Sequence, residues 1–231
     1  MNPTKIEYLD YTWNPMVGCS GKNCAVSAKC WAKGQAKRQM HNCQLCYEFK
    51  PHTHFGRLKQ PYQVLKPSRV GVCFSSDFWD EAFTIQDRKQ VFGTAIGADY
   101  HWFFNLTKQP QNIPKELVFP KNWIQGVSVN CKADLWRIAK LQETLAPFKA
   151  ISFEPIYDDI ASEEIHLTGI DWVILGGQTR PHKMPDVEWI QNLIDLATFS
   201  TPQVPVFMKN NLNPYDGLKE LPIQLASVGV K

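Results

Sequence analysis

Five of the seven cysteines in this 231-residue chain fall within one short segment, with the spacing Cys19-x4-Cys24-x5-Cys30-x12-Cys43-x2-Cys46. Seven cysteines are about 3% of the residues, too few for a disulfide scaffold of this length, and an odd number cannot all pair within one chain. Thiolates that lie so close together in a reducing compartment favour a metal site over disulfides.

Two metal sites fit this spacing. In the first, Cys24, Cys30, Cys43 and Cys46 hold a tetrahedral zinc ion and Cys19 is left over. In the second, Cys19, Cys24 and Cys30 hold three irons of a [4Fe-4S] cluster, and the fourth iron is open to a substrate or cofactor. Cys43 and Cys46 then belong to a second site. Composition and spacing leave both open, whereas position favours the cluster, because a predicted strand precedes the three cysteines and places them in a first loop.

The later cysteine pair is followed by two histidines. Cys43, Cys46, His52 and His54 form a C-x2-C-x5-H-x-H pattern, which is a plausible set of zinc ligands. A histidine in such a segment can equally be a hydrogen-bonded core residue or a cap. The remaining cysteines, Cys73 and Cys131, are expected to be packing residues, although Cys131 could face the site.

Positive charge gathers in the same part of the chain. Residues 1–72 carry 11 basic and 3 acidic residues, whereas residues 73–231 carry 14 and 19. The stretch from Cys19 to Cys46 has no acidic residue and five basic ones: Lys22, Lys29, Lys33, Lys37 and Arg38. Such a segment could bind an anionic ligand or nucleic acid, offset the charge of a thiolate-bound metal, or form a solvated helix face.

The elements that must position these residues alternate along the chain. Apolar runs predict strands at 12–17, 70–75, 102–107, 124–130, 150–153, 172–175 and 204–208, and amphipathic periodicity predicts helices near 83–98, 132–146 and 186–198. Alternating buried strands and helices are typical of parallel βαβ units, so the expected fold class is α/β with about six or seven mostly parallel strands. No repeat or linker interrupts the chain, so we expect one domain over residues 1–231, with a cysteine-rich metal-binding segment at 19–54.

Polar residues follow most of these strands, at the edge of a parallel barrel or of an open doubly wound sheet where chemistry takes place. Glu154 follows a buried run, where a carboxylate is costly unless it meets a cation, and Lys209 is its expected partner. This pair could be catalytic or a structural salt bridge. Gln178 and Arg180 are candidates for substrate binding, since arginine can bind a phosphate or carboxylate through two hydrogen bonds.

Eight segments of the sequence occur in a characteristic order: WNPMVGC, CWAKGQAKR, PHTHFGRLKQP, KPSRVGVCFSSDF, GVSVN, ISFEP, DWVILGGQTRP and PVFMKNNL. In this order they resemble an uncharacterised phage-type protein family with an N-terminal three-cysteine motif, which is similar to radical S-adenosylmethionine (SAM) enzymes. The resemblance covers nearly the whole chain, from about residue 6 to residue 212. It implies a partial (β/α) TIM-like barrel of the radical SAM type.

The resemblance also implies a cofactor. SAM would bind the open iron of a [4Fe-4S] cluster, and its reductive cleavage would give a 5′-deoxyadenosyl radical that abstracts hydrogen from a substrate. Ser75, Ser76 and Asp77 would contact the amino end of SAM, and Ser128 and Asn130 would lie near its ribose. Two glycines that permit close backbone approach complete the expected cofactor site: Gly176 and Gly177.

The chain departs from the family pattern at the cysteines. Family members commonly have a first cysteine followed by a CxxCY pair, whereas Ser27 stands three residues before Cys30. Either Cys24 replaces the missing ligand, or the pair Cys43 and Cys46 closes the cluster with the first cysteine. We favour Cys19, Cys24 and Cys30, because the helix expected after the last ligand, WAKGQAKR, follows Cys30.

Two functions are therefore carried forward. The first is a radical SAM-like enzyme that acts on an unidentified anionic or nucleic-acid-related substrate and could need a separately encoded partner protein. The alternative is a zinc-stabilised, non-enzymatic nucleic-acid-binding protein with Trp31 and Tyr47 available to stack on bases. No run approaches the roughly 20 apolar residues of a membrane span, and the start MNPTKIEYLD has no apolar signal core, so we expect a cytoplasmic protein without membrane contact.

Overall fold

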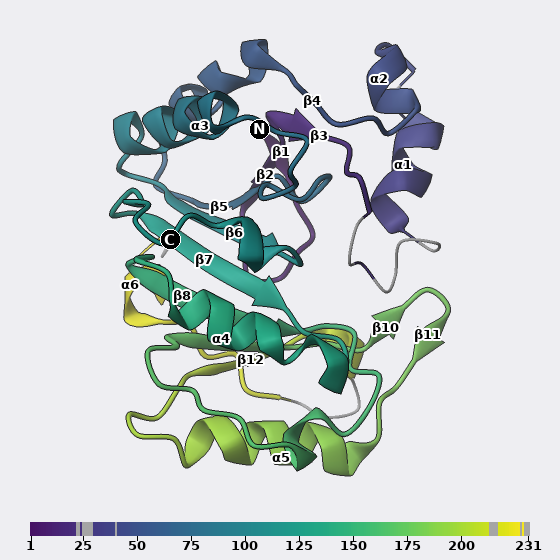
Figure 1. Cartoon of the computed structure of the whole chain (residues 1–231), viewed down its shortest axis with the longest axis vertical. Helices are drawn as coiled ribbons and strands as arrows, with labels where there is room; N and C mark the ends of the chain where they lie inside the picture. Colours follow the sequence, from purple (N-terminus) through teal and green to yellow (C-terminus); the bar gives the residue numbers. More distant parts are fainter. Residues whose placement is uncertain (22–23, 25–29, 40, 213–216, 227, 229–231) are drawn as a thin grey trace.

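The computed structural model describes the chain except for residues 22–23, 25–29, 40, 213–216, 227 and 229–231. Its centre is an eight-stranded sheet with the order β1-β2-β5-β6-β7-β8-β9-β12. The first pair is antiparallel and all the other neighbours are parallel. The strands are β1 (Asn2–Pro3), β2 (Tyr11–Trp13), β5 (Arg69–Val72), β6 (Trp102–Thr107), β7 (Trp123–Ser128), β8 (Phe148–Phe153), β9 (Trp172–Leu175) and β12 (Val206–Met208). Among the described residues no pairing joins β1 to β12, so the sheet is open (Figure 1).

Three helices cover one face of this sheet: α3 (Ile85–Gly97), α4 (Trp136–Gln142) and α5 (Val187–Thr198). Apolar residues at helical spacing in α5, such as Ile190 and Leu193, pack on alternate residues of the strands, as the periodicity predicted. Helix α3 begins with a capping box in which Thr84 Oγ1 accepts from the backbone of Asp87 at 3.1 Å. The predicted helix at 132–146 is shorter, because a 3-10 turn (Lys132–Asp134) precedes α4.

The other face of the sheet changes character along its strands. Phe104, Trp172 and Phe207 pack around Tyr8 from the N-terminal segment, whose ring centroid lies 5.3–5.7 Å from theirs. Leu225 of α6 (Ile223–Ala226) belongs to the same cluster. Side chains alternate between the faces of a strand, so positions two and four residues further on share this face. On β7, β8 and β12, where Ile124, Ala150 and Phe207 belong to this cluster, such positions near the carboxyl ends are polar: Ser128, Ser152, Glu154 and Lys209.

Several predicted strand ends were wrong for local reasons. The run at 12–17 forms two strands, because Asn14 and Pro15 separate β2 from β3 (Met16–Val17), which pairs with β4 (His52–Thr53) instead of the large sheet. The run at 70–75 ends at Val72, since Cys73 adopts a positive φ of 59°. The strand predicted at 124–130 ends at Ser128, and the one predicted at 204–208 begins at Val206.

Several of the smaller elements lie near the carboxyl ends of the strands. In Figure 1 the arrowhead of β7 points toward the side that carries α1 (Trp31–Gln39) and the hairpin of β10 (Gln178–Thr179) and β11 (His182–Lys183). Helix α2 (Gln44–Tyr47) packs beside α1. The further 3-10 turns are Phe55–Lys59, Pro61–Gln63, Pro110–Asn112, Ile160–Ser162 and Asn210–Leu212.

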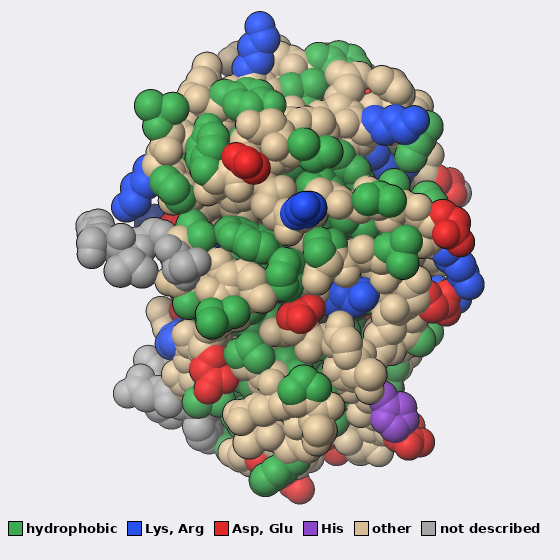
Figure 2. Space-filling view, turned by 90° about the vertical axis from the view of Figure 1, so that its left-hand side faces the viewer, with side chains coloured by type: hydrophobic (Ala, Val, Ile, Leu, Met, Phe, Trp, Pro, Cys, Tyr) green, Lys and Arg blue, Asp and Glu red, His purple; other side chains and the backbone are tan. Residues whose placement is uncertain are grey.

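The opposite side of the molecule has a mixed surface. Figure 2 faces the amino ends of the strands and shows hydrophobic side chains interspersed with isolated basic and acidic ones. No helix in the described part of the chain has the length and apolar character needed to cross a membrane.

Candidate functional site

Cys19 lies against the carboxyl end of β5. Gly18, with φ +84°, makes a parallel bridge to Ser76, and its N–H donates to Ser75 O at 3.3 Å. A side chain at Gly18 would lie 2.3 Å from Lys50 O, so the close approach of these two backbones requires glycine. The first cysteine is thereby held at the edge where the sequence predicted the site.

Asp80 fixes the start of the cysteine loop. Its Oδ2 accepts from the Ser20 backbone at 2.8 Å, from Ser20 Oγ at 2.6 Å and from Gln109 Nε2 at 3.0 Å, and the Cys19 thiol donates to it at 3.4 Å. Burial alone would raise the pKa of Asp80, but these bonds and one from the backbone of Ala82 outweigh it and lower that pKa. Asp80 was not predicted, although it lies only three residues after the predicted Asp77.

The same surroundings keep Cys19 protonated in the metal-free chain. Burial, followed by the nearby carboxylates of Asp77 and Asp80, raises the pKa of the Cys19 thiol to about 12, although the N–H of Gly21 donates to its sulfur at 3.2 Å. A thiol of this kind is a poor nucleophile by itself, because the thiolate is the reactive form. A metal centre would deprotonate it, since a coordinated thiol carries no proton.

The other two cysteines of the predicted triad lie on either side of the undescribed residues 25–29. Cys30 directly precedes α1, and Cys19 and Cys30 both pack against a small cluster made by Ala32, Ala36 and Phe49. Burial, followed by the electrostatic interaction with Cys24, raises the pKa of Tyr157, which lies in the loop after β8. Cys19 and Cys30 thus lie against the same cluster, and the place of Cys24 in the triad stays a prediction.

The three polar residues predicted after β5 differ in what they contact. Asp77 is buried, and it accepts from Thr107 Oγ1 at 2.6 Å and from the backbone N–H groups of Lys108 and Trp79 at 2.8 and 3.0 Å. Burial outweighs these bonds and raises its pKa. Ser76 Oγ donates to Met16 O at 2.9 Å. Asp77 therefore joins β5 to β6, and Ser76 joins the loop after β5 to β3.

Two buried polar atoms at this edge have no hydrogen-bond partner among the described residues: Ser75 Oγ and Asn130 Oδ1. The Asn130 amide is fixed, because its Nδ2 donates to Glu154 O at 2.6 Å and to Pro155 O at 3.1 Å. An unpaired buried acceptor or hydroxyl is costly, so such atoms suit a bound polar group. Ser128, also predicted, is buried at the end of β7, and its carbonyl accepts from Arg137 at 2.7 Å.

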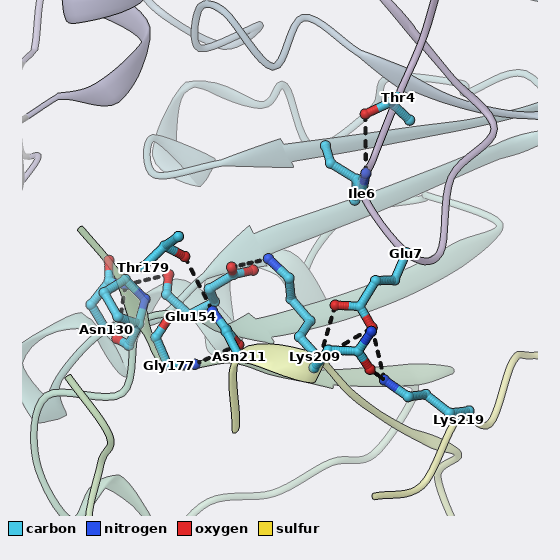
Figure 3. Close-up of polar contacts among 12 residues, drawn as sticks. Thr4, Ile6, Glu7, Asn130, Glu154, Gly177, Thr179, Lys209, Asn211 and Lys219 are labelled. Carbon is cyan, nitrogen blue, oxygen red and sulfur yellow. Dashed lines mark hydrogen bonds and ion pairs between the residues drawn. The ribbon is translucent and has the colours of Figure 1, made fainter. Parts of the chain in front are cut away.

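The predicted pair of Glu154 and Lys209 forms. Lys209 extends from the end of β12 toward Glu154, which follows β8, and the two make an ion pair with 17% and 21% of their side chains exposed (Figure 3). Glu7 lies next to them and accepts from the backbone of Asn210 and from Lys219 at 2.8 Å each. Glu7 and Lys219 were not predicted, and no motif in the sequence indicated them.

The two glycines approach the chain's own side chains. A Cβ atom on Gly176 would lie 2.8 Å from Glu154 Cγ. Gly177 N–H donates to Asn211 Oδ1 at 3.1 Å, and Asn211 Nδ2 donates to Gly177 O at 2.7 Å (Figure 3). In the structure the two glycines therefore approach Glu154 and Asn211 of the chain itself, and their contact with a cofactor stays a prediction. Gln178 Nε2 donates to Pro181 O within the β10–β11 hairpin, whose turn exposes Arg180.

The structure describes all but two of the remaining predicted residues. Cys73 is buried as expected, whereas Cys131 is half-buried. Lys33, Lys37 and Arg38 are on exposed positions of α1. Lys22 and Lys29 lie outside the described residues. Cys43 and Cys46 lie with His52 and His54 in a separate group that does not include Cys19.

Comparison with known proteins adds a family and a fold. The family model described as "Protein of unknown function (DUF5131)" matches residues 3–213. None of the curated proteins matches the sequence. A solved structure of a spore photoproduct lyase double mutant, with bound AdoMet and dinucleoside spore photoproduct, is 12% identical with a TM-score of 0.54. Two single mutants of that lyase are 12% identical with TM-scores of 0.52.

Each of these matches covers 86% of this chain and 64% of the lyase chain, so the chain spans less than two thirds of the proteins it resembles. At this identity the likeness shows a shared fold. The mostly parallel open sheet is therefore of the spore photoproduct lyase type.

Proposed function

The chain belongs to the DUF5131 family of proteins of unknown function, and we propose that it is a radical SAM enzyme. The observation that carries the proposal is the cysteine loop, which begins at the carboxyl end of β5 in a fold also found in a lyase with bound AdoMet, that is, SAM. In this proposal the open sheet is a partial barrel, and its carboxyl edge is the active site.

Cys19, Cys24 and Cys30 are the proposed ligands of a [4Fe-4S] cluster. Their thiols suit the cluster because cysteine thiolates are its usual ligands, and three of them leave one iron open. When bound, the cluster would supply the electron that cleaves SAM into methionine and a 5′-deoxyadenosyl radical. Asp80 is a positioning residue, since it holds Cys19 and Ser20 through its Oδ2. Helix α1 begins directly after Cys30 and fixes the far end of the loop.

The proposed contacts with SAM are the two buried atoms that lack a partner among the described residues. Ser75 Oγ can accept from the amino group of SAM or donate to its carboxylate, and Asn130 Oδ1 can accept from a hydroxyl or amino group. Ser76 and Asp77 would support this wall through their bonds to β3 and β6. Ser128 completes the wall on β7.

An anionic substrate suits the remaining charges. Lys209 is partly exposed beside Glu154 at the open edge, and Arg180 projects from the β10–β11 turn on the same side of the sheet. In this proposal the two cations bind the anionic group of the substrate, and Glu154 orients Lys209. A nucleotide or nucleic acid has the required charge, and the exposed basic residues of α1 would extend the binding surface.

The test is chemical. Protein purified without oxygen and reconstituted with iron and sulfide should show iron-sulfur absorption and should form 5′-deoxyadenosine from SAM after reduction. Cys19→Ala should abolish both, whereas Cys131→Ala, a matched loss of a half-buried thiol, should retain both. Absence of absorption and of 5′-deoxyadenosine in the wild type would overturn the proposal.

The alternative, a zinc-stabilised nucleic-acid-binding protein, is favoured by one observation. Helix α1 exposes Lys33, Lys37 and Arg38 and leaves 60% of Trp31 accessible. Zinc without iron in the same preparation, together with nucleic-acid binding that weakens steeply with salt, would support this function instead.

A further inference from the structure

Four potential metal ligands converge in the segment that joins α2 to β4. One ligand atom from each of Cys43, Cys46, His52 and His54 lies within 4.8 Å of all the others. His52 Nε2 lies 3.6 Å from Cys43 Sγ and 3.3 Å from Cys46 Sγ, and His54 Nε2 lies 3.0 Å from Cys46 Sγ and 2.9 Å from His52 Nε2. Zinc bonds of about 2.3 Å to sulfur and about 2.0 Å to nitrogen place tetrahedral ligands roughly 3.3–3.8 Å apart. The four atoms thus have nearly the spacing of the ligands of one small ion.

Local structure explains why these atoms meet. Cys43 caps the short helix α2 and Cys46 lies within it, so the two sulfurs are one helical turn apart. His52 and His54 are two residues apart on an extended segment, where alternate side chains point to the same side. The His52 Nδ1 contacts Lys50 O at 2.8 Å, and because a carbonyl can only accept, Nδ1 carries the proton. The lone pair of His52 Nε2 therefore faces the other three ligands, as in histidines that bind metal.

We propose that Cys43, Cys46, His52 and His54 bind one structural zinc ion. Two thiolates and two imidazoles in a tetrahedral arrangement are a set that zinc prefers, and four protein ligands leave no open position for catalysis. A Rieske-type iron-sulfur centre also uses two cysteines and two histidines, but it places the histidines on one iron and the cysteines on the other. The short sulfur–nitrogen distances around Cys46 and His52 fit a single shared ion instead.

The charge and burial of the group also suit zinc. Cys46 is 1% exposed and the other three ligands are half-buried. Two thiolates without a cation would be costly at such a place, whereas a divalent ion makes the set neutral. This inference does not rest on the proposed cluster, because it uses none of Cys19, Cys24 or Cys30.

The ion would stabilise the backbone that leads to Cys19. Strand β4 pairs with β3 through Met16 with Thr53 and through Val17 with His52. In addition, the N–H of His54 donates to Pro15 O at 2.7 Å. Zinc would therefore link α2 to β4 and, through this pairing, to the residues that directly precede the cysteine loop.

Elemental analysis of the intact chain, expressed with zinc and purified without chelator, tests the inference. We expect about one zinc per chain in the wild type, in Cys131→Ser and in Cys19→Ser, and almost none in Cys43→Ser. Cys43 is chosen because it is half-buried, and Cys131→Ser is its matched control. Zinc absent from the wild type, zinc retained in Cys43→Ser, or iron in place of zinc would overturn the inference.

A second measurement does not depend on how well a variant folds. Cobalt(II) added to the wild-type chain after removal of zinc should give the visible bands of a tetrahedral site together with thiolate charge-transfer absorption. Zinc should displace the cobalt and abolish these bands. An octahedral spectrum, or one without thiolate absorption, would contradict a site made from two cysteines and two histidines.

Discussion

Replacing Gly176 with alanine should displace the side chain of Glu154. A Cβ atom on Gly176 would lie 2.8 Å from Glu154 Cγ, 2.9 Å from its Cδ and 3.2 Å from its Cβ. The contacts include atoms near the backbone as well as the end of the side chain, so a small rotation cannot relieve them. Glu154 must leave its position, and its ion pair with Lys209 would be lost.

The expected cost follows from these contacts. Forcing an additional methyl group into a packed position destabilises a protein by about 1–3 kcal/mol. The ion pair is partly exposed and screened by water, so its loss adds at most about 1 kcal/mol. We therefore expect Gly176→Ala to lower the free energy of unfolding by about 1–4 kcal/mol, measured by urea unfolding with tryptophan fluorescence, and to lower the Tm by about 2–4 °C per kcal/mol.

A double-mutant cycle isolates the cause. In a Glu154→Ala background most of the colliding atoms are absent, so the added methyl group should cost less than half as much as in the wild type. The control is Gly93→Ala, since a Cβ atom there meets nothing within 4 Å in α3 and should stabilise the chain by about 0.5–1 kcal/mol. An equal cost of Gly176→Ala in both backgrounds would refute the idea that this glycine makes room for Glu154.

Two further predictions concern the cysteine loop and the cofactor wall. Asp80→Ala should lower the free energy of unfolding at pH 7 by about 1–3 kcal/mol, because the buried amide of Gln109 loses its acceptor and the cysteine loop loses its bonds from Ser20. Because the pKa of Asp80 is lower in the folded chain, its contribution to the free energy of unfolding is complete above the unfolded pKa of about 3.9 and is lost as the pH falls through the folded pKa. The difference in the free energy of unfolding between variant and wild type should therefore shrink on acidification. A difference that grew on acidification would contradict this. Ser75→Ala should leave the free energy of unfolding within about 0.5 kcal/mol of wild type but weaken SAM binding about 2–12-fold in calorimetry, since the hydroxyl has no partner among the described residues. Unchanged SAM affinity would remove Ser75 from the proposed site.

The positions of the main strands and helices could be predicted because burial imposes a regular pattern on the sequence. The strand at 102–107 and the one at 172–175 have the predicted bounds, since the second is a continuous apolar run and the first is mostly aromatic and apolar around Asn105. Strand ends were less predictable. The end of β5 depends on the positive φ of Cys73, and a cysteine gives no sequence signal for that conformation.

The candidate site was predictable where a residue is costly without a partner. Glu154 after an apolar run required a cation, and Lys209 supplies it. The contact between Asp80 and Ser20 joins residues 60 positions apart, and either aspartate of the run SSDFWD could have made it. Only the fold decides that Asp77 bonds to Thr107 while Asp80 bonds to the cysteine loop.

The two proposed metal sites meet at Gly18. Its backbone bridges to Ser76 at the end of β5, and the same residue approaches Lys50 O so closely that no side chain fits. Lys50 O in turn accepts from His52, a proposed zinc ligand, while Cys19 follows Gly18 directly. The zinc group and the end of β5 therefore hold the first cysteine from two sides before any cluster binds. Such support lowers the entropy that cluster binding must overcome, which is the physical advantage of a metal-stabilised segment beside the cysteine loop.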